Sequence, residues 1–205
     1  MGGELFGDWD KAKEIVEGMQ ERWKKAAEKA VRAEANFLRG KVVEGLREQA
    51  PGGRAFKPLS PLTLAVRAFA GFKGTKALIR RGDLRNAIVV KEAHEETFVG
   101  ILRTARGKGG ESLVNVGEIN EFGAGPIIVP ITPKSRRFYF AALTRAGITP
   151  PASAGGTGEG LAVAIVRIPP RPFMTPVFEK YATPEQVRER FWRHVIHDLG
   201  GELGK

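Results

Sequence analysis

The 205-residue sequence contains no cysteine and only three histidines. Without cysteine the chain can form neither disulfide bonds nor thiolate metal sites, and it needs no oxidising compartment. No apolar run approaches the ~20 residues of a membrane-spanning helix. The first residues also lack the basic patch and apolar core of a signal peptide. We therefore expect a soluble intracellular protein without a membrane partner.

Signals for catalysis are equally scarce. No P-loop, dinucleotide fingerprint, nucleophile elbow or zincin motif occurs in the sequence. His194 and His197 are spaced to share one helical face beside Asp198 and could bind a metal, but a solvated or packed pair is the simpler interpretation. Residues 81–83 spell a three-residue adhesion motif (RGD), which chance matches often produce. We predict no catalytic residue, no metal site and no cofactor, and a hydrolase with an unrecognised site is the least favoured class.

The formal net charge is +10, and the positive excess lies in one part of the chain. Residues 51–110 contain twelve Lys or Arg against four Asp or Glu, whereas residues 1–50 contain ten of each. This asymmetry favours a face that meets DNA or an acidic protein surface, although a solvated basic surface explains it as well. The candidate contact residues are Lys73, Lys76, Arg80, Arg81, Arg85, Arg106 and Lys108.

Hydrophobic periodicity indicates an α+β fold. Apolar residues at three- and four-residue spacings predict a long amphipathic helix over residues 8–49, in which Gly40 marks a place for a kink. Shorter helices are predicted over 61–69, from Asp83, from Thr175 and from Thr183 to a glycine pair at 200–201. Strands are predicted at 88–91, 97–103, 127–133, 137–140 and 161–167. We expect a long N-terminal helix (residues 1–50) packed on a mostly antiparallel sheet of four to five strands, with C-terminal helices, within a single domain whose α+β part spans 51–205.

A proline-rich segment at residues 168–178 (IPPRPFMTPVF), here called the corner, joins the last predicted strand to a helix. Proline fixes φ and keeps the preceding residue out of the helical region, so the start of the corner must be extended. Phe173 is the expected anchor into the hydrophobic core. The residues assigned to fold or assembly here are Ile168, Pro169, Pro170, Arg171, Pro172, Phe173 and Phe178.

Four segments, taken in order, resemble the phage virion morphogenesis (tail completion) proteins of tailed bacteriophages. They are residues 56–64 (FKPLSPLTL), 78–88 (LIRRGDLRNAI), 119–123 (INEFG) and 168–174 (IPPRPFM). The family has the patterns W-x-P-L-S-P-x-T, L-x-x-T-G-x-L-x-x-S-I, I-H-E-F-G and I-P-A-R-P-F-L. Phe56 replaces its usual Trp, Ala87 its Ser and Asn120 its His, and residues 141–160 have no counterpart. The resemblance covers roughly residues 55–195.

The resemblance implies a non-enzymatic virion protein that completes the tail or neck at the head–tail junction and is assembled in the host cytoplasm. Such a protein would form a homo-oligomeric ring, a hexamer or dodecamer, against connector or stopper proteins and tail tube or terminator proteins, with genomic DNA in its channel. We expect the corner and the turn motif (Ile119, Glu121, Phe122 and Gly123) to fix the subunit fold. The long helix or the two glycine-rich loops, residues 106–110 and 150–160, would then make the contacts between subunits.

The alternative is a basic nucleic-acid-binding module that uses residues 54–108 directly. This segment lacks aromatic residues arranged as a base-stacking platform, and no recognition helix stands out in it. We therefore favour the structural virion role over the nucleic-acid-binding role.

Overall fold

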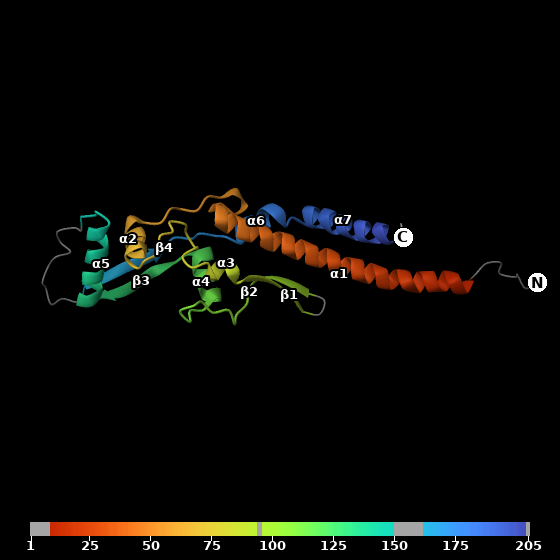
Figure 1. Cartoon of the computed structure of the whole chain (residues 1–205), viewed down its shortest axis with the longest axis horizontal. Helices are drawn as coiled ribbons and strands as arrows, with labels where there is room; N and C mark the ends of the chain where they lie inside the picture. The colour runs from red at the N-terminus through yellow and green to blue at the C-terminus, as the bar shows by residue number, and fades with distance from the viewer. Residues whose placement is uncertain (1–8, 94–95, 150–161, 204–205) are drawn as a thin grey trace, which may run out of the picture.

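A long helix organises the molecule. The computed structural model describes residues 9–93, 96–149 and 162–203. Helix α1 (Trp9–Glu48) continues through Gly40 without interruption, and α7 (Pro184–Leu203) runs antiparallel along it (Figure 1). Between them, in chain order, lie η1 (Pro51–Gly53), α2 (Pro61–Phe69), α3 (Asp83–Asn86), β1 (Ile88–Ala93), β2 (Glu96–Ile101), α4 (Leu113–Phe122), β3 (Ala124–Ile131), α5 (Pro133–Arg145), β4 (Ala162–Ile168) and α6 (Thr175–Tyr181).

The α+β class is confirmed, but the predicted single sheet is two separate ribbons. In the described residues, β1 pairs with β2 and β3 pairs with β4, each pair antiparallel and two strands wide. The count of four to five strands was slightly too high, because the segment 137–140 is helical. Thr132 opens this helix: its side-chain oxygen accepts a hydrogen bond from the Ser135 N–H at 3.1 Å, and Pro133 follows at the first helical position. Helix α5 then packs on α2, with the rings of Phe69 and Phe138 5.2 Å apart.

The main hydrophobic core lies where α1 ends. It consists of buried residues from α1, α3, β1, the corner and α6, namely Val42, Leu46, Leu84, Ile88, Phe173 and Val177. Phe173 is 1% exposed, which confirms the predicted anchor. A second, smaller core between α1 and α7 contains Ala26, Ala30 and Val195.

The helix ends predicted from the sequence can be compared one by one with those in the structure. Ser60 caps α2 as expected, accepting from the Thr63 N–H at 3.2 Å, and Thr183 accepts from the Gln186 N–H at the start of α7. Three expectations were wrong. Asp83 does not cap α3 but accepts from the Lys108 N–H at 3.4 Å, Thr175 is the first residue of α6 rather than its cap, and α7 continues past the predicted glycine stop to Leu203.

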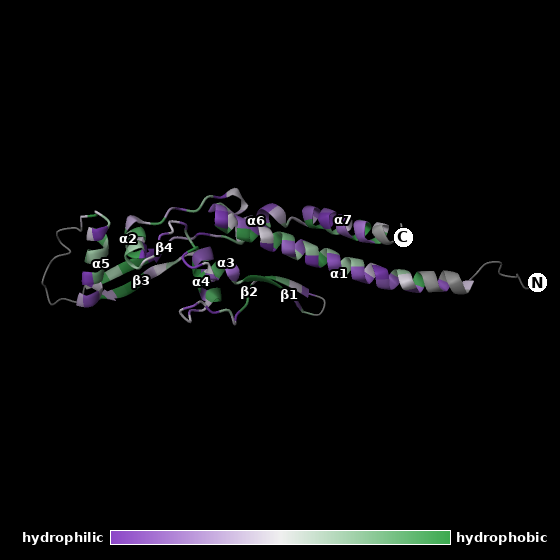
Figure 2. Cartoon of the chain, in the orientation of Figure 1, coloured by the Kyte–Doolittle hydropathy of each residue, from purple (hydrophilic) through white to green (hydrophobic). Residues whose placement is uncertain are grey.

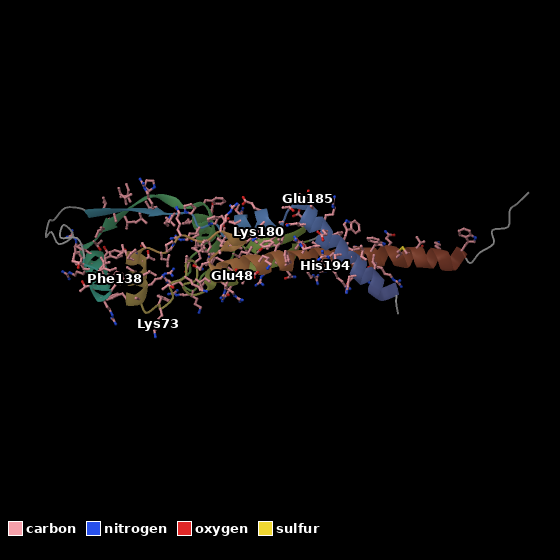
Figure 3. The ribbon with its side chains drawn as sticks, turned by 90° about the horizontal axis from the view of Figure 1, so that it is seen from above. Glu48, Lys73, Phe138, Lys180, Glu185 and His194 are labelled. Carbon is pink, nitrogen blue, oxygen red and sulfur yellow. The ribbon has the colours of Figure 1, made fainter. Side chains whose placement is uncertain are left out.

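The molecule is long and has a large surface. It exposes 14,885 Å², whereas a compact chain of 22.3 kDa would expose about 9,400 Å². The 24 residues outside the described ranges cannot account for the whole difference, because a segment of that length has at most about 3,800 Å² of surface. Figure 3 shows the spread: Phe138 and Lys73 lie at the end occupied by α2 and α5, and His194 lies on α7 where it crosses α1. No helix in the described ranges is long and apolar enough to cross a membrane.

Candidate assembly surfaces and the junction that supports them

The four segments that carry the family resemblance meet around Arg171. Its Nε donates to the Lys57 carbonyl at 3.1 Å and its Nη2 to the Pro58 carbonyl at 3.3 Å, which ties the corner to residues 56–64. Its backbone N–H donates to the Asn120 carbonyl at 2.6 Å, in the turn motif. Residues 78–88 complete the junction, since Leu84 packs with Phe173 in the main core. The corner therefore acts as a structural junction.

Glu121 has a capping role that its sequence position did not suggest. Its Oε2 accepts hydrogen bonds from the N–H groups of Phe173 at 2.8 Å and Met174 at 3.1 Å, and its Oε1 accepts from the Thr175 N–H at 2.8 Å. One carboxylate from α4 therefore serves the three backbone donors that precede and open α6. A negative charge at this position also suits the positive end of the helix.

Gly123 holds the turn motif close to the corner. It ends α4 with φ = 80°, which favours glycine, but its ψ of 172° is not that of the left-handed C-cap expected from the sequence. A Cβ atom at residue 123 would lie 2.9 Å from the Ile168 carbonyl oxygen and 3.1 Å from Pro170 Cδ, so any side chain would push the two segments apart. The other two turn residues face outward: Ile119 is 36% and Phe122 74% exposed.

The seven predicted basic contact residues do not act as one free patch. The Lys76 Nζ donates to the Arg47 carbonyl at 2.6 Å, so this side chain satisfies the end of α1. Arg85 donates to the Asn86 side chain, and Arg106 donates to the carbonyls of Arg103 and Ala105. Of the seven side chains, those of Lys76, Arg85 and Arg106 thus have partners within the protein.

The two neighbouring arginines of the predicted set share an aromatic partner. The guanidinium carbons of Arg80 and Arg81 lie 4.6 Å and 5.5 Å from the centre of the Phe72 ring. Such cation–π contacts hold the guanidinium groups in place without neutralising their charge. Lys108 is connected to the same region through its backbone N–H, which donates to Asp83. Arg80 and Arg81 therefore keep a positive charge that an acidic partner could bind.

The β3–β4 ribbon presents an apolar face to solvent. Ile128 lies opposite Ile165, and Pro130 lies opposite Val163, so these four residues point to the same side and are here called the open face. Ile128 is 69%, Ile165 66% and Val163 56% exposed. Figure 2 shows both strands largely in the hydrophobic colour. Clustered apolar side chains at this exposure are typical of a surface that another protein covers.

The first turns of α1 form a second apolar surface. The helix extends past the C-terminal end of α7 (Figure 1), and Trp9, Val16, Met19 and Trp23 lie along it at helical spacing with 41% to 66% of each residue exposed. Trp23 is the last of the four before α7 begins to cover the helix, and it meets Trp192 edge to face at 6.1 Å. The stripe that packs on α7 thus continues, uncovered, toward the helix start.

A largely buried ion pair fastens α7 to α1 further along the helix. Arg190 donates from Nε to Glu34 Oε2 at 2.8 Å and from Nη2 to Glu34 Oε1 at 2.6 Å, and Nη2 also contacts the Tyr181 carbonyl. The Arg190 guanidinium carbon stacks 4.5 Å from the centre of the Phe37 ring. Glu34 is only 7% exposed. Hydrogen bonding to the Glu34 carboxylate raises the pKa of Arg190. The two helices are thereby held in one register.

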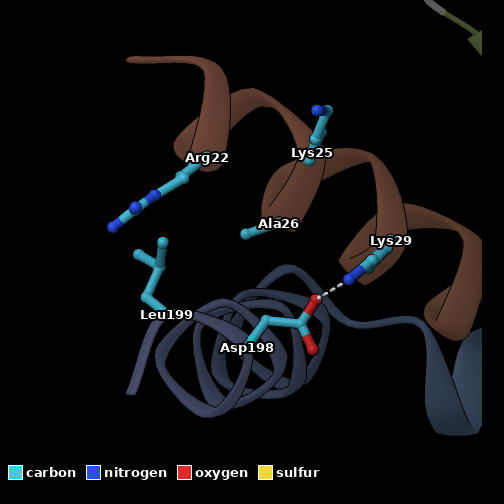
Figure 4. A pocket seen from close by; sticks show the side chains of 6 residues that line it. All are labelled: Arg22, Lys25, Ala26, Lys29, Asp198 and Leu199. Carbon is cyan, nitrogen blue, oxygen red and sulfur yellow. Dashed lines mark ion pairs between the residues drawn. The ribbon is translucent and has the colours of Figure 1, made fainter. Parts of the chain in front are cut away.

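His194, His197 and Asp198, which were considered as metal ligands, do not come together as a metal site. His194 and His197 are both exposed, and Asp198 forms an ion pair with Lys29 at 3.0 Å. That pair lies in a pocket of about 250 Å³ between α1 and α7, whose lining residues are Arg22, Lys25, Ala26, Lys29, Asp198 and Leu199 (Figure 4). Across the described ranges, no three or more His, Asp or Glu side chains come together as metal ligands.

Comparison of the chain with protein-family models, with curated protein sequences and with solved structures gave no match. The resemblance to tail completion proteins therefore rests on the four sequence segments alone. A functional proposal can draw on those segments, on the junction they form and on the two apolar surfaces.

Proposed function

We propose that this chain is a structural subunit of the head–tail junction of a tailed bacteriophage, where it completes the tail or neck as part of a homo-oligomeric ring. The observation that carries the proposal is the convergence of the four resembling segments. They are spread over more than a hundred positions of the sequence, and in the fold they meet at Arg171, Glu121 and Phe173. Because these four segments together form one structural junction, their resemblance to the family is best explained by a shared fold.

The surface of the subunit supports an assembly role. Its exposed area exceeds that of a compact protein of this mass by thousands of square ångströms. The open face and the first turns of α1 offer apolar contacts near opposite ends of the molecule (Figure 1). Two different surfaces on one subunit suit a heterologous contact, in which one copy binds the next and rotation closes a ring. The ring would be a hexamer or dodecamer, with connector or stopper proteins on one side and tail tube or terminator proteins on the other.

Light scattering of the purified protein over a range of concentrations tests the proposal. We expect a closed oligomer, or a mass that rises with concentration toward one. Replacing Ile128 and Ile165 together by Asp should shift the protein to the monomer, because two charges would be buried in the contact. Ala141→Asp, which adds an acid at an exposed position of α5, is the matched control and should assemble normally.

Two results would count against the ring. One is a protein that stays monomeric at every concentration. The other is a protein whose mass changes only when duplex DNA is added, in a manner that salt suppresses, because phosphate neutralisation releases counterions. The second result would favour the nucleic-acid-binding module over residues 54–108. Circular dichroism of the Ile128 and Ile165 variant checks that its loss of assembly is not a loss of fold.

A further inference from the structure

We propose that Arg67, Arg80 and Arg171 form a pocket that binds a carboxylate side chain from an acidic segment of a protein partner. The inference stands apart from the proposed virion role, because it depends only on the chemistry of the pocket. It concerns residues that come from three parts of the chain. Arg67 belongs to α2, Arg80 lies between α2 and α3, and Arg171 lies in the corner.

The three arginines line one pocket of about 240 Å³. The remaining lining residues are Leu59, Ala77, Leu78, Leu84, Val116 and Asn120. The walls are therefore mainly apolar, and the guanidinium groups supply most of the polarity. Arg171 is only 9% exposed. A buried guanidinium among apolar walls is an unusual arrangement, because burying a charge without a partner of opposite charge is costly.

None of the three arginines forms an ion pair within the described part of the chain. Two carboxylates, Asp83 and Glu111, line a neighbouring pocket of about 150 Å³ with Arg80, but neither pairs with it. The excess of positive charge in the pocket affects Arg67. Partial burial lowers the pKa of Arg67, and the positive charges of Arg80 and Arg171 lower it further. The three positive charges therefore repel one another, and a bound anion would relieve this repulsion.

Each guanidinium keeps donors that could bind such an anion. Arg67 uses Nη1 for the Lys76 carbonyl at 2.8 Å, and Arg171 uses Nε and Nη2 for the Lys57 and Pro58 carbonyls. Arg80 lies against the Phe72 ring and has no hydrogen bond of its own to the described residues. Guanidinium groups carry more N–H donors than these contacts use, in a planar fork that matches a carboxylate. The internal bonds fix the groups in place for binding.

The shape of the pocket favours a side-chain carboxylate over the backbone of DNA. A phosphodiester has a bulky sugar on each side, so a phosphate of a duplex cannot enter a recess of this size to reach Arg171. A glutamate carries its charge on a short apolar stem, which suits walls made of Leu59, Leu78 and Val116. An acidic segment of a partner protein could therefore insert one such side chain while the exposed Arg80 guides its approach.

The test uses the full-length protein and propanoate, which reproduces the end of a glutamate side chain. Thermal unfolding is measured with 100 mM sodium propanoate and with sodium chloride at equal ionic strength. A ligand that binds only the folded protein raises the unfolding temperature, and we expect a rise of about 3–5 °C relative to chloride. Arg80→Gln should abolish most of this rise, and without propanoate it should unfold no earlier than the wild type. Arg85→Gln removes the same charge outside the pocket and should keep the rise.

Two outcomes would overturn the proposal. Equal propanoate responses in the wild type, Arg80→Gln and Arg85→Gln would show that the effect is a general property of the salt. A short duplex DNA that raises the unfolding temperature through Arg80 but not Arg85, while propanoate fails to do so, would assign the pocket to phosphate instead. A response to propanoate that requires Arg80 alone, with no such response to DNA, supports the carboxylate pocket.

Discussion

Replacing Glu121 is the sharpest test of how the junction is held together. Its carboxylate accepts three backbone N–H bonds, two from Phe173 and Met174 through Oε2 and one from Thr175 through Oε1. Hydrogen bonds to charged groups each contribute roughly 1.5–3 kcal/mol, and an unsatisfied buried donor costs about 1–3 kcal/mol. Phe173 and Met174 are at least partly buried, so water cannot fully replace the lost partner.

Glu121→Gln keeps one carbonyl oxygen of the same shape. That oxygen can serve Phe173 and Met174 at neutral strength, but the amide NH₂ then faces the Thr175 N–H, and two donors oppose each other. We expect a loss of about 2–3 kcal/mol in the free energy of unfolding for Glu121→Gln, and of about 3–5 kcal/mol for Glu121→Ala, which leaves all three donors without a partner.

Urea unfolding followed by circular dichroism measures these losses. With a slope of about 2 kcal/mol/M, Glu121→Gln should lower the midpoint by roughly 1–1.5 M and leave the slope unchanged. Glu118→Gln is the matched control, since Glu118 is an exposed carboxylate one turn earlier on α4 and should change stability by less than about 0.5 kcal/mol. If the Glu121 and Glu118 variants unfold at the same urea concentration, Glu121 does not hold the corner.

Three further substitutions test other parts of the structure. Phe173→Asp places a charge in the main core and should abolish both folding and assembly, as read by circular dichroism and light scattering; retention of both would refute the anchor. Glu34→Ala leaves Arg190 without its buried partner and should cost about 3–5 kcal/mol in urea unfolding, whereas the exposed Glu189→Ala should cost under about 0.5 kcal/mol. Gly123→Ala should lower stability by about 1–3 kcal/mol in thermal unfolding, and a neutral result would contradict the close approach.

Much of the fold follows from local sequence signals. The long helix, the caps at Ser60 and Thr183, the two strands after α3 and the burial of Phe173 were predicted because each depends on neighbouring residues. The segment 137–140 was predicted as a strand because aromatic residues favour strands. The Thr132-Pro133 pair before it was a helix-start signal of the kind used correctly at Ser60.

The parts that could not be predicted depend on distant residues. Glu121 looked like an ordinary surface carboxylate, because its three partners lie more than fifty positions further along the chain. Lys76 was expected to face a partner, yet its ammonium group donates a hydrogen bond to the Arg47 carbonyl. The arginine pocket likewise has no signal in the sequence, since Arg67, Arg80 and Arg171 come together only in the folded chain. Hydrophobic patterning sets the elements, and contacts between elements set the roles of polar residues.

The long sequence separation between the corner and its partners also determines when the protein can fold during synthesis. Arg171 bonds to a residue 114 positions earlier, and Arg190 bonds to a residue 156 positions earlier. Contacts of such sequence separation form slowly, because a long loop must close before they contribute. Helix α1 leaves the ribosome before α7, so the part of its apolar stripe that α7 covers stays exposed until α7 has been translated. Ribosome-bound chains that stop short of residue 171 should therefore engage chaperones far longer than chains that extend past α7.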